Sequence, residues 1–243
     1  MATEKVTGIV LGTVKHSDRH NVVTLFTRQY GRLPLLVPVA KGKSATARNA
    51  AHMPLNVISA DINFVKSREM QFPGKYHRLT LWRNIYFDPV KMSITFFISE
   101  FLNSYLRFSS ADPRLWDYII AMTSALDKES GSVANFHISF LINFSDYAGV
   151  RPDMRMWLPG SLFDMREGVC TMRHPGHRDI LTDKETYYLR KLMRMNVRNA
   201  HLFRFSSANR REILTRLLRY YAIHFPGTAN LKSPEVLSEV FES

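Results

Sequence analysis

Hydrophobic residues in the first part of the chain alternate with polar ones at the two-residue period of β-strands. Three runs rich in β-branched and aromatic residues, 6–15, 21–28 and 33–40, are separated by short polar turns. Such runs at intervals of about 8–12 residues indicate a small β-sandwich or barrel. We expect further strands at 55–60 and 61–66, and a last strand, or the exit from the barrel, at 76–81.

The third run predicts a strand that is buried on one side. Four of its aliphatic residues share one face at period two: Leu33, Leu35, Val37 and Val39. Pro34 and Pro38 fall on the opposite face, and a proline has no N–H to donate to a neighbouring strand. The run should therefore lie at an edge, at a bulge, or in a barrel that does not fully close.

From residue 88 onward the period changes to three and four residues, which is typical of α-helices. Asp88 followed by Pro89 is a helix start signal, and Asp112 followed by Pro113 repeats it. Thr182 and Glu185 form a capping box, and Asn209 with Glu212 suggests another start. The pattern predicts helices at about 89–108, 113–127, 133–147, 183–195, 209–225 and 235–241.

Residues 150–182 interrupt the helices with prolines and glycines and predict a small insertion with a hairpin of 161–164 against 168–172. Cys170, His174 and His177 raise the question of a metal. A structural zinc normally takes four ligands in two close pairs, and the chain offers no first pair in 152–164. We therefore expect no metal here.

These patterns together predict an α+β protein of several domains. Residues 1–83 would form an N-terminal five-stranded β-barrel. Residues 84–149 and 183–243 would form an α-helical domain, with 150–182 as its small irregular insertion. A small, partly open barrel with basic turns is the general form of an oligonucleotide/oligosaccharide-binding (OB) fold.

The net charge of the chain bears on its binding partners and not on its fold. The 243 residues carry a net charge of +12, with +9 in residues 1–83, −3 in 84–149, +1 in 150–182 and +5 in 183–243. A surplus of this kind indicates a polyanionic partner, nucleic acid or an anionic membrane surface. No apolar run is long enough to cross a bilayer. The single cysteine excludes an internal disulfide framework, and with no signal peptide in the pattern we expect an intracellular protein.

The basic residues on the predicted barrel are the candidate nucleic-acid ligands. They are Lys15, Arg19, Arg28, Arg32, Lys41, Lys43 and Arg48. The segment 41–48 is either a flexible basic loop that becomes ordered on phosphate or a solvated hairpin connection. Four aromatic residues could stack on bases, although a small barrel needs aromatic side chains to fill its core: Tyr30, Phe64, Phe72 and Tyr76.

Catalysis is not indicated. Metal-dependent nucleases and polymerases need clustered carboxylates, and the four acidic residues of the basic front part are scattered: Glu4, Asp18, Asp61 and Glu69. The sequence contains no Walker, nucleophile-elbow or HExxH motif. We expect a binding protein and no catalytic residues.

A second basic group lies on the predicted helix 209–225. It consists of Arg210, Arg211, Arg216 and Arg219, close in sequence to Tyr220 and Tyr221. Arginines beside an apolar groove suit an acidic, aromatic peptide. The alternative is a solvated helix face.

Several short motifs, in order along nearly the whole chain, resemble the RecO family of bacterial recombination mediators. They are Gly8-Ile9-Val10-Leu11, Leu25-Phe26-Thr27 with Tyr30-Gly31, Ala40-Lys41-Gly42-Lys43, Gly149-Val150-Arg151-Pro152-Asp153, Phe163-Asp164 with Gly168-Val169-Cys170, Leu217-Leu218-Arg219-Tyr220-Tyr221 with His224, and Lys232-Ser233-Pro234-Glu235-Val236-Leu237. Each motif is degenerate by itself, so the resemblance rests on their order and spacing.

The resemblance implies an N-terminal OB fold, a helical domain and a role in the cytoplasm, on nucleoid DNA. It implies binding of single- and double-stranded DNA, strand annealing, and work with RecR and the C-terminal tail of single-strand-binding protein (SSB) to load RecA. Many such proteins carry a four-cysteine zinc module, of which this chain keeps only Cys170. We expect Trp157, Leu158, Leu162 and Phe163 to hold the insertion together in place of zinc. An RNA-binding OB protein and a helical interaction adaptor remain the alternatives.

Overall fold

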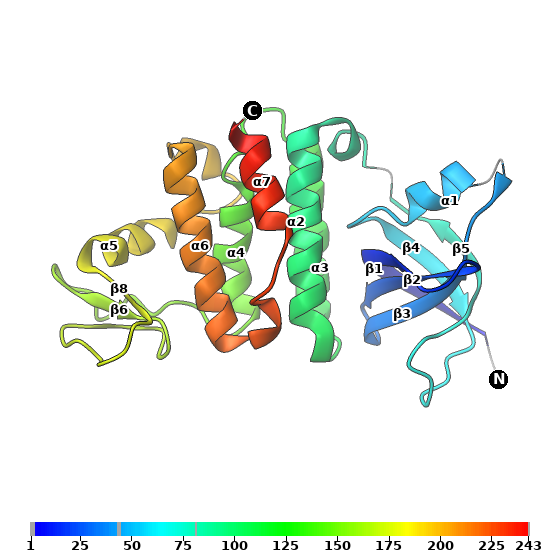
Figure 1. Cartoon of the computed structure of the whole chain (residues 1–243), viewed down its shortest axis with the longest axis horizontal. Coiled ribbons are helices and arrows are strands. Elements are labelled where there is room, and N and C mark those ends of the chain that lie inside the picture. The colour runs from blue at the N-terminus through cyan, green and yellow to red at the C-terminus, as the bar shows by residue number, and fades with distance from the viewer. Residues whose placement is uncertain (1–2, 43–44, 81, 243) are drawn as a thin grey trace. The chain divides into compact units, whose positions relative to one another are not determined.

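The first five strands form one antiparallel sheet in the order β3-β2-β1-β4-β5 (Figure 1). The computed structural model describes residues 3–42, 45–80 and 82–242. The strands are β1 (Glu4–Lys15), β2 (His20–Thr27), β3 (Gly31–Pro38), β4 (Val57–Ile62) and β5 (Pro73–Arg78). As predicted, β3 with its two prolines lies at an edge of the sheet. The expected strands 55–60 and 61–66 are instead a single strand, and the fifth strand begins earlier than predicted.

Gln71, two residues before β5, is hydrogen-bonded to β3 at the opposite edge of the sheet. Leu36 N donates to Gln71 O at 2.9 Å, Gln71 N donates to Pro34 O at 2.9 Å, and Leu35 and Gln71 form a parallel bridge. Opposite this contact, β1 carries an irregularity between Val10 and Gly12 where it pairs with β2. An extra residue of this kind bends a strand, which helps the sheet curve upon itself.

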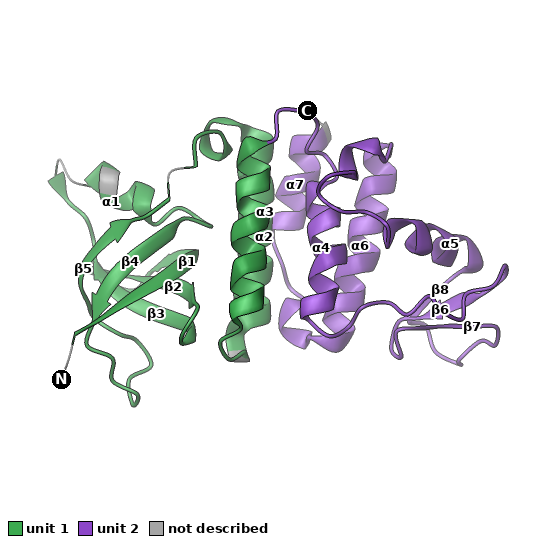
Figure 2. Cartoon of the chain, turned by 180° about the vertical axis from the view of Figure 1, so that it is seen from behind, with its two compact units in different colours: residues 1–128 green, residues 129–243 purple. Residues whose placement is uncertain are grey.

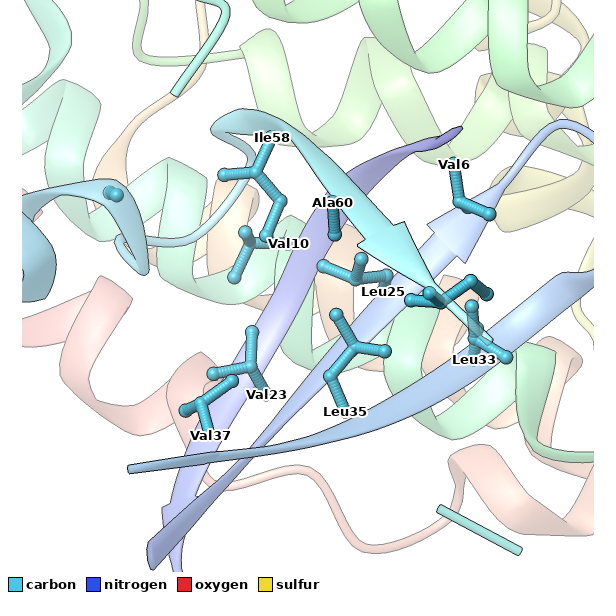
Figure 3. Packing of buried hydrophobic residues seen from close by; sticks show 11 residues of the cluster. Val6, Val10, Val23, Leu25, Leu33, Leu35, Val37, Ile58 and Ala60 are labelled. Atoms are coloured by element: carbon cyan, nitrogen blue, oxygen red, sulfur yellow. The ribbon is translucent and has the colours of Figure 1, made fainter. Parts of the chain in front are cut away.

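Side chains that alternate along these strands form the core of the sheet (Figure 3). Leu33, Leu35 and Val37 are buried as predicted. The remaining buried members of the cluster are Val6, Val10, Val23, Leu25, Ala51, Ile58, Ala60 and Ile62. Tyr30, Phe64 and Tyr76 pack against the cluster, so these three aromatic residues serve packing, as a small barrel requires.

The segment after β3 differs from its prediction as a loop. Residues Ala45–Ala51 form the short helix α1. Two hydrogen bonds hold its C-terminal end: Asn56 Nδ2 donates to Ala50 O at 2.7 Å, and Thr13 Oγ1 on β1 donates to the carbonyl of His52, the residue after the helix, at 3.4 Å. Helix α1 therefore lies against the sheet and does not form a free loop.

Two long helices complete the first part of the chain, α2 (Pro89–Tyr105) and α3 (Pro113–Lys128). Asp88 caps α2 as predicted, and its side chain accepts from the N–H groups of Val90 and Lys91. Ser99 Oγ on α2 donates to Leu11 O on β1 at 2.5 Å. Ile9 and Phe26 are register partners, point away from the sheet core and are fully buried, so this face of β1 and β2 is covered.

The second part contains four helices and a small three-stranded sheet of order β7-β6-β8. The helices are α4 (Phe136–Tyr147), α5 (Asp183–Leu192), α6 (Ser207–His224) and α7 (Ser233–Glu242), and the strands are β6 (Leu162–Asp164), β7 (Val169–Thr171) and β8 (Ile180–Leu181). The predicted hairpin is present as β6 and β7. The Thr182 capping box is confirmed. The predicted start of α6 at Asn209 is wrong, because Ser206 is the cap and accepts from Asn209 N.

Contacts between residues divide the chain into two compact units, 1–128 and 129–243 (Figure 2). This division differs from the boundary expected after residue 83, because α2 and α3 group with the sheet. Within the second unit, Tyr221 Oη on α6 donates to Leu141 O on α4 at 2.6 Å, and Asn135 Nδ2 donates to Phe203 O at 2.7 Å. These buried bonds hold α4, α6 and the segment before α6 together.

Candidate nucleic-acid interface

One end of the five-stranded sheet brings together basic residues that are far apart in sequence. At the β1–β2 turn, Ser17 Oγ accepts from His20 N at 3.1 Å, and the carbonyl of Arg19 accepts from Val39 N at 2.9 Å. The chain therefore leaves β3 beside this turn, and Lys41 follows two residues later. We call this end, with Lys15, Arg19 and Lys41, the β1–β2 turn end.

The cations of the β1–β2 turn end are exposed to solvent. Lys15 Nζ lies 2.7 Å from Asp18 Oδ1, but the two side chains are 71% and 94% exposed, and such surface pairs contribute about 1 kcal/mol or less. Within the described residues, Arg19 and Lys41 form no ion pair. Their charges are therefore available to an anion.

Arg48 lies on the exposed side of α1. Burial raises the pKa of Tyr76 on β5, and the positive charge of Arg48 partly offsets that rise. Tyr76 in turn packs on His52 with ring centroids 5.2 Å apart. Arg48 therefore adds positive charge where α1 covers the sheet. Lys43, the remaining cation predicted for this region, lies outside the described residues.

At the other end of the sheet, the two predicted cations, Arg28 and Arg32, contact helices α3 and α2. Arg28 lies 3.1 Å from Asp117 on α3, and its guanidinium is 5.8 Å from the centroid of Trp116. Arg32 Nε donates to Asn103 on α2 at 3.3 Å, and burial, together with the nearby charge of Arg107, lowers the pKa of Arg32. With about 3.3 Å per residue, the eight-residue strand β2 separates the two ends by roughly 25 Å. The seven predicted residues thus do not form one patch.

The loop between β4 and β5 presents Phe72, one of the four aromatic residues for which the sequence left base stacking and core packing open. Gln71 is buried and fastens the loop, because its side-chain amide bonds Val65 N, Val65 O and Arg68 O at 2.9–3.1 Å. The next residue, Phe72, is 54% exposed, and the Arg68 guanidinium lies 5.7 Å from its ring centroid. A cation beside an exposed ring suits a stacked base with its phosphate.

Sequence reasoning also missed two exposed cations on the edge strand β5, Lys75 and Arg78. The expected strand, 76–81, excluded Lys75 and included Arg78, and neither residue was named as a candidate ligand. With the correct bounds, both residues lie on the strand and both are exposed.

The four arginines of α6 do not share one face. Arg210 is half-buried, donates to Asn135 Oδ1 at 3.2 Å and lies 5.0 Å from the ring centroid of Phe241. Arg219 binds Asp179 of the insertion at 2.6 Å, and Arg216 lies 2.7 Å from Glu185 of α5. Arg211 lines a shallow hollow on α6 together with Arg216. Tyr221 is buried, and Tyr220 is largely buried but lines a cavity between α5 and α6.

A cavity of about 630 Å³ lies between α5 and α6 in the second unit. Its apolar wall includes Leu189, Leu192 and Leu217. Charged residues of both signs line it as well: Lys184, Glu185, Arg204, Glu212 and Arg216. The cavity is large enough for an apolar side chain or two of a peptide.

Polar contacts and a few buried side chains hold the insertion 150–182. Phe163 is buried against Tyr220, with ring centroids 5.8 Å apart, as its packing role predicted. Leu158 is 58% exposed, so its predicted packing role is wrong. Asp179 accepts from both Arg166 and Arg219, and both bonds lower the pKa of Asp179. This carboxylate therefore ties the insertion to α6.

The metal question concerns the same insertion. Cys170 Sγ lies 3.5 Å from Met154 Sδ, His177 Nε2 lies 3.3 Å from Asp164 Oδ2, and His174 Nδ1 accepts from Gly176 N. Burial raises the pKa of the Cys170 thiol, with a smaller contribution from Asp153, which disfavours a thiolate. In residues 3–42, 45–80 and 82–242, no three His, Cys, Asp or Glu side chains gather as a metal-holding group.

Among the described helices, none combines the length and apolar character needed to cross a membrane. Two family models match the chain in succession: "Recombination protein O N terminal" over residues 1–73 and "Recombination protein O C terminal" over residues 86–235.

Curated relatives match over almost the whole chain. A protein of Phocaeicola vulgatus named DNA repair protein RecO is 32% identical over 98% of this chain and 99% of its own length. Proteins of the same name from Porphyromonas gingivalis and Flavobacterium psychrophilum are 32% and 26% identical, over 96% and 98% of this chain and 97% and 98% of their own lengths. The chain therefore belongs to the recombination protein O (RecO) family.

Proposed function

We propose that this chain is a non-enzymatic DNA-binding mediator of recombination and DNA repair. It would bind single-stranded and double-stranded DNA, promote annealing of complementary strands and, with RecR, help load RecA onto SSB-coated DNA. Membership of the RecO family supports the repair role. One structural observation supports the DNA-binding part. Arg19 and Lys41, at the β1–β2 turn end, are exposed and form no ion pair within the described residues.

We infer that the five-stranded sheet is an OB barrel. Its strand order, the helix α1 between β3 and β4, and the parallel bridge of Leu35 with Gln71 support this assignment. OB barrels bind oligonucleotides on strands 2 and 3 and on the β1–β2 and β4–β5 loops. Arg19 lies in the first of these loops and Phe72 ends the second.

The face of β2 and β3 that bears Val22 and Phe26 can accommodate a DNA strand only on one half. Phe26 is fully buried and Arg32 bonds α2 near the β2–β3 turn. Val22 and Leu36, register partners nearer the β1–β2 turn end, are partly exposed. We place the strand on this open half, with phosphates near Arg19 and Lys41 and a base on Phe72.

Salt dependence tests the location of this site. Each phosphate contact contributes about 0.7 to the log–log slope of affinity against salt on a single strand. The double variant Arg19→Ala/Lys41→Ala should lower that slope by about 1.4, similarly across DNA sequences. The control Arg28→Gln/Arg114→Gln removes the same charge at the opposite end, where both arginines pair with carboxylates, and should change the slope little. Equal changes in the two double variants would refute the location.

The mediator role needs a separate assay. Complementary strands coated with SSB should anneal faster when the protein is added, and Arg19→Ala/Lys41→Ala should slow that reaction more than the control double variant does. Binding to matched DNA and RNA strands separates this proposal from an RNA-binding module. Clear preference for RNA, with no annealing, would count against the mediator.

We also propose that the acidic tail of SSB docks at the cavity between α5 and α6. The apolar wall suits an aromatic side chain of the tail, and Arg204 and Arg216 suit its carboxylates. Glu185 and Glu212 oppose this on the same cavity, although Arg216 neutralises Glu185. Arg204→Ala should weaken binding of the tail peptide in a fluorescence anisotropy titration, whereas Arg198→Ala, which is not part of the cavity lining, should leave it unchanged.

A further inference from the structure

A group of aromatic and basic side chains lies on α5 and the neighbouring insertion, with Tyr187, Tyr188 and Lys191 exposed and Trp157 and Arg190 partly buried. The Arg190 guanidinium is 4.2 Å from the ring centroid of Trp157, and Lys191 Nζ is 4.2 Å from that of Tyr187 and 6.0 Å from that of Tyr188. We call these five residues the α5 platform. Every member belongs to the second compact unit.

The helix itself explains why these side chains face outward. Thr186, Leu189 and Leu192 are the buried residues of α5. Tyr187 and Tyr188 lie off that buried face and are 40% and 48% exposed. The Tyr187 ring centroid lies 6.3 Å from that of Trp157 and 5.9 Å from that of Tyr188, so the three rings form one contiguous aromatic surface that is open to a ligand.

The platform also adjoins the most one-sided stretch of charge in the sequence. Residues 186–211 contain seven Lys or Arg and no Asp or Glu. Glu185, the nearest acidic residue before this stretch, is engaged by Arg216 and by the capping box of α5. The local field around the platform therefore favours a polyanion over a cation or a neutral peptide.

We propose that the α5 platform is a second site for single-stranded nucleic acid, which stacks unpaired bases on Tyr187 and Tyr188. Aromatic faces combined with a basic surrounding are the usual means of binding single strands without sequence preference, because every base offers a π-face. The Lys191 ammonium lies over the Tyr187 ring, and it can turn to a phosphate while that ring accepts a base. Duplex DNA keeps its bases stacked internally and does not offer them to the rings.

The test separates stacking from charge. The Tyr187→Ala variant of the full chain keeps every charge, so it should weaken binding of an oligo(dT) strand by roughly fivefold or more. It should leave binding of an abasic strand of equal length unchanged, because that strand has the same phosphates but no bases. Tyr187→Phe should restore oligo(dT) binding. Phe87→Ala, which removes another aromatic side chain that is 86% exposed, should have no effect.

A second readout does not depend on affinity. Oligo(dT) should change the tryptophan emission of the protein, and Trp157→Phe should remove most of that change. These measurements are repeated in the Arg19→Ala/Lys41→Ala background, where the barrel site is weakened. An effect of Tyr187→Ala in both backgrounds supports the platform whether or not the barrel variant itself loses affinity.

Three results would overturn the proposal. Oligo(dT) binding could be unchanged in Tyr187→Ala, or oligo(dT) and abasic strands could lose affinity equally. Alternatively, the variant could lose affinity for an acidic, aromatic peptide while its binding of oligo(dT) stays intact. The last result would identify the platform as a protein-docking surface.

Discussion

At the scale of single residues, Gly31 connects the β2–β3 turn to the chain after α2. Its φ is +67°, and a Cβ there would lie 2.9 Å from Ala111 N and 3.0 Å from Ser110 C. We expect Gly31→Ala to lower the free energy of unfolding by about 3 kcal/mol, of which about 1–2 kcal/mol comes from the left-handed backbone and the rest from the clash. Urea denaturation measures the loss.

Gly42 provides the matched control. Its φ is +69°, but a Cβ there would have open space around it. Gly42→Ala should therefore show only the backbone cost, about 1–2 kcal/mol. If both alanine variants lost the same stability, the close packing of the β2–β3 turn on residues 109–111 would make no energetic contribution.

His137 makes the second unit sensitive to acid. Complete burial, assisted by the charge of Arg210, lowers the pKa of His137 to about 3, whereas an unfolded chain has a histidine pKa of about 6.5. Below pH 6.5 the unfolded state takes up a proton that the folded state does not. Stability should therefore fall between about pH 6.5 and pH 3, by at most about 1.4 kcal/mol per pH unit.

Unfolding measured in urea at several pH values between 7 and 4 tests this slope. His137→Phe should flatten it, because the ring of His137 already stacks on Phe241 with centroids 5.4 Å apart and a phenyl ring can replace it. His201→Gln, at an exposed histidine, should keep the full slope. A slope that survives in His137→Phe would assign the acid sensitivity to other groups.

At the scale of elements, Asp127 near the C-terminal end of α3 is hydrogen-bonded to the segment that links the sheet to α2. Its carboxylate accepts from Arg83 N, Asn84 N and Ile85 N at 2.8–3.1 Å. Desolvation raises the pKa of this carboxyl, but the three backbone bonds and the charge of Lys91 outweigh it and leave the pKa below its usual value.

Replacing this carboxylate should therefore be costly. Asp127→Asn places an amide N–H₂ opposite backbone donors and should lower the free energy of unfolding by about 2 kcal/mol. Asp117→Asn on the same helix breaks only an exposed pair with Arg28 and should cost less than about 1 kcal/mol. Thermal denaturation of both variants checks the order, and equal losses would contradict it.

Helix starts show which elements the sequence could predict. The caps at Asp88 and Thr182 were predicted correctly because the capping side chain and its N–H partners are local in sequence. Helix α1 was missed because its seven residues are mostly small or polar, and the bond from Thr13 to His52, the residue after the helix, joins positions 39 residues apart in sequence. The start of α6 was misplaced because Asn209 and Glu212 imitate a cap that Ser206 actually provides.

The candidate site was predictable to a similar extent. Composition correctly indicated that the first strands carry the positive charge, but not which cations stay exposed. Arg28 meets Asp117 across 89 residues of sequence, and Arg219 meets Asp179 across 40. No local pattern reveals such pairs. The α5 platform was missed for the same reason, because Trp157 and Arg190 come together only through the insertion.

At the scale of the whole molecule, the domain boundary expected from the sequence pattern differs from the boundary between the compact units. The two family models leave a gap between residues 73 and 86, close to the boundary expected after 83. The compact units instead divide after Lys128. Bonds from β1 and from the β2–β3 turn to α2 and α3 explain the difference: Ser99 with Leu11, Arg32 with Asn103, and Arg28 with Asp117.

If both units contact one DNA strand, their phosphate contacts should add. Lys191→Ala/Arg194→Ala removes one cation of the α5 platform and an exposed one just after α5. It should lower the salt slope on a long single strand by about 1.4, the same decrease expected for Arg19→Ala/Lys41→Ala at the barrel. The quadruple variant should then lose about 2.8, because contacts to different phosphates add in the salt slope. On a strand too short to reach both sites, the losses should not add. A quadruple variant that loses no more than the more affected double variant on the long strand would mean that only one of the two surfaces contacts DNA.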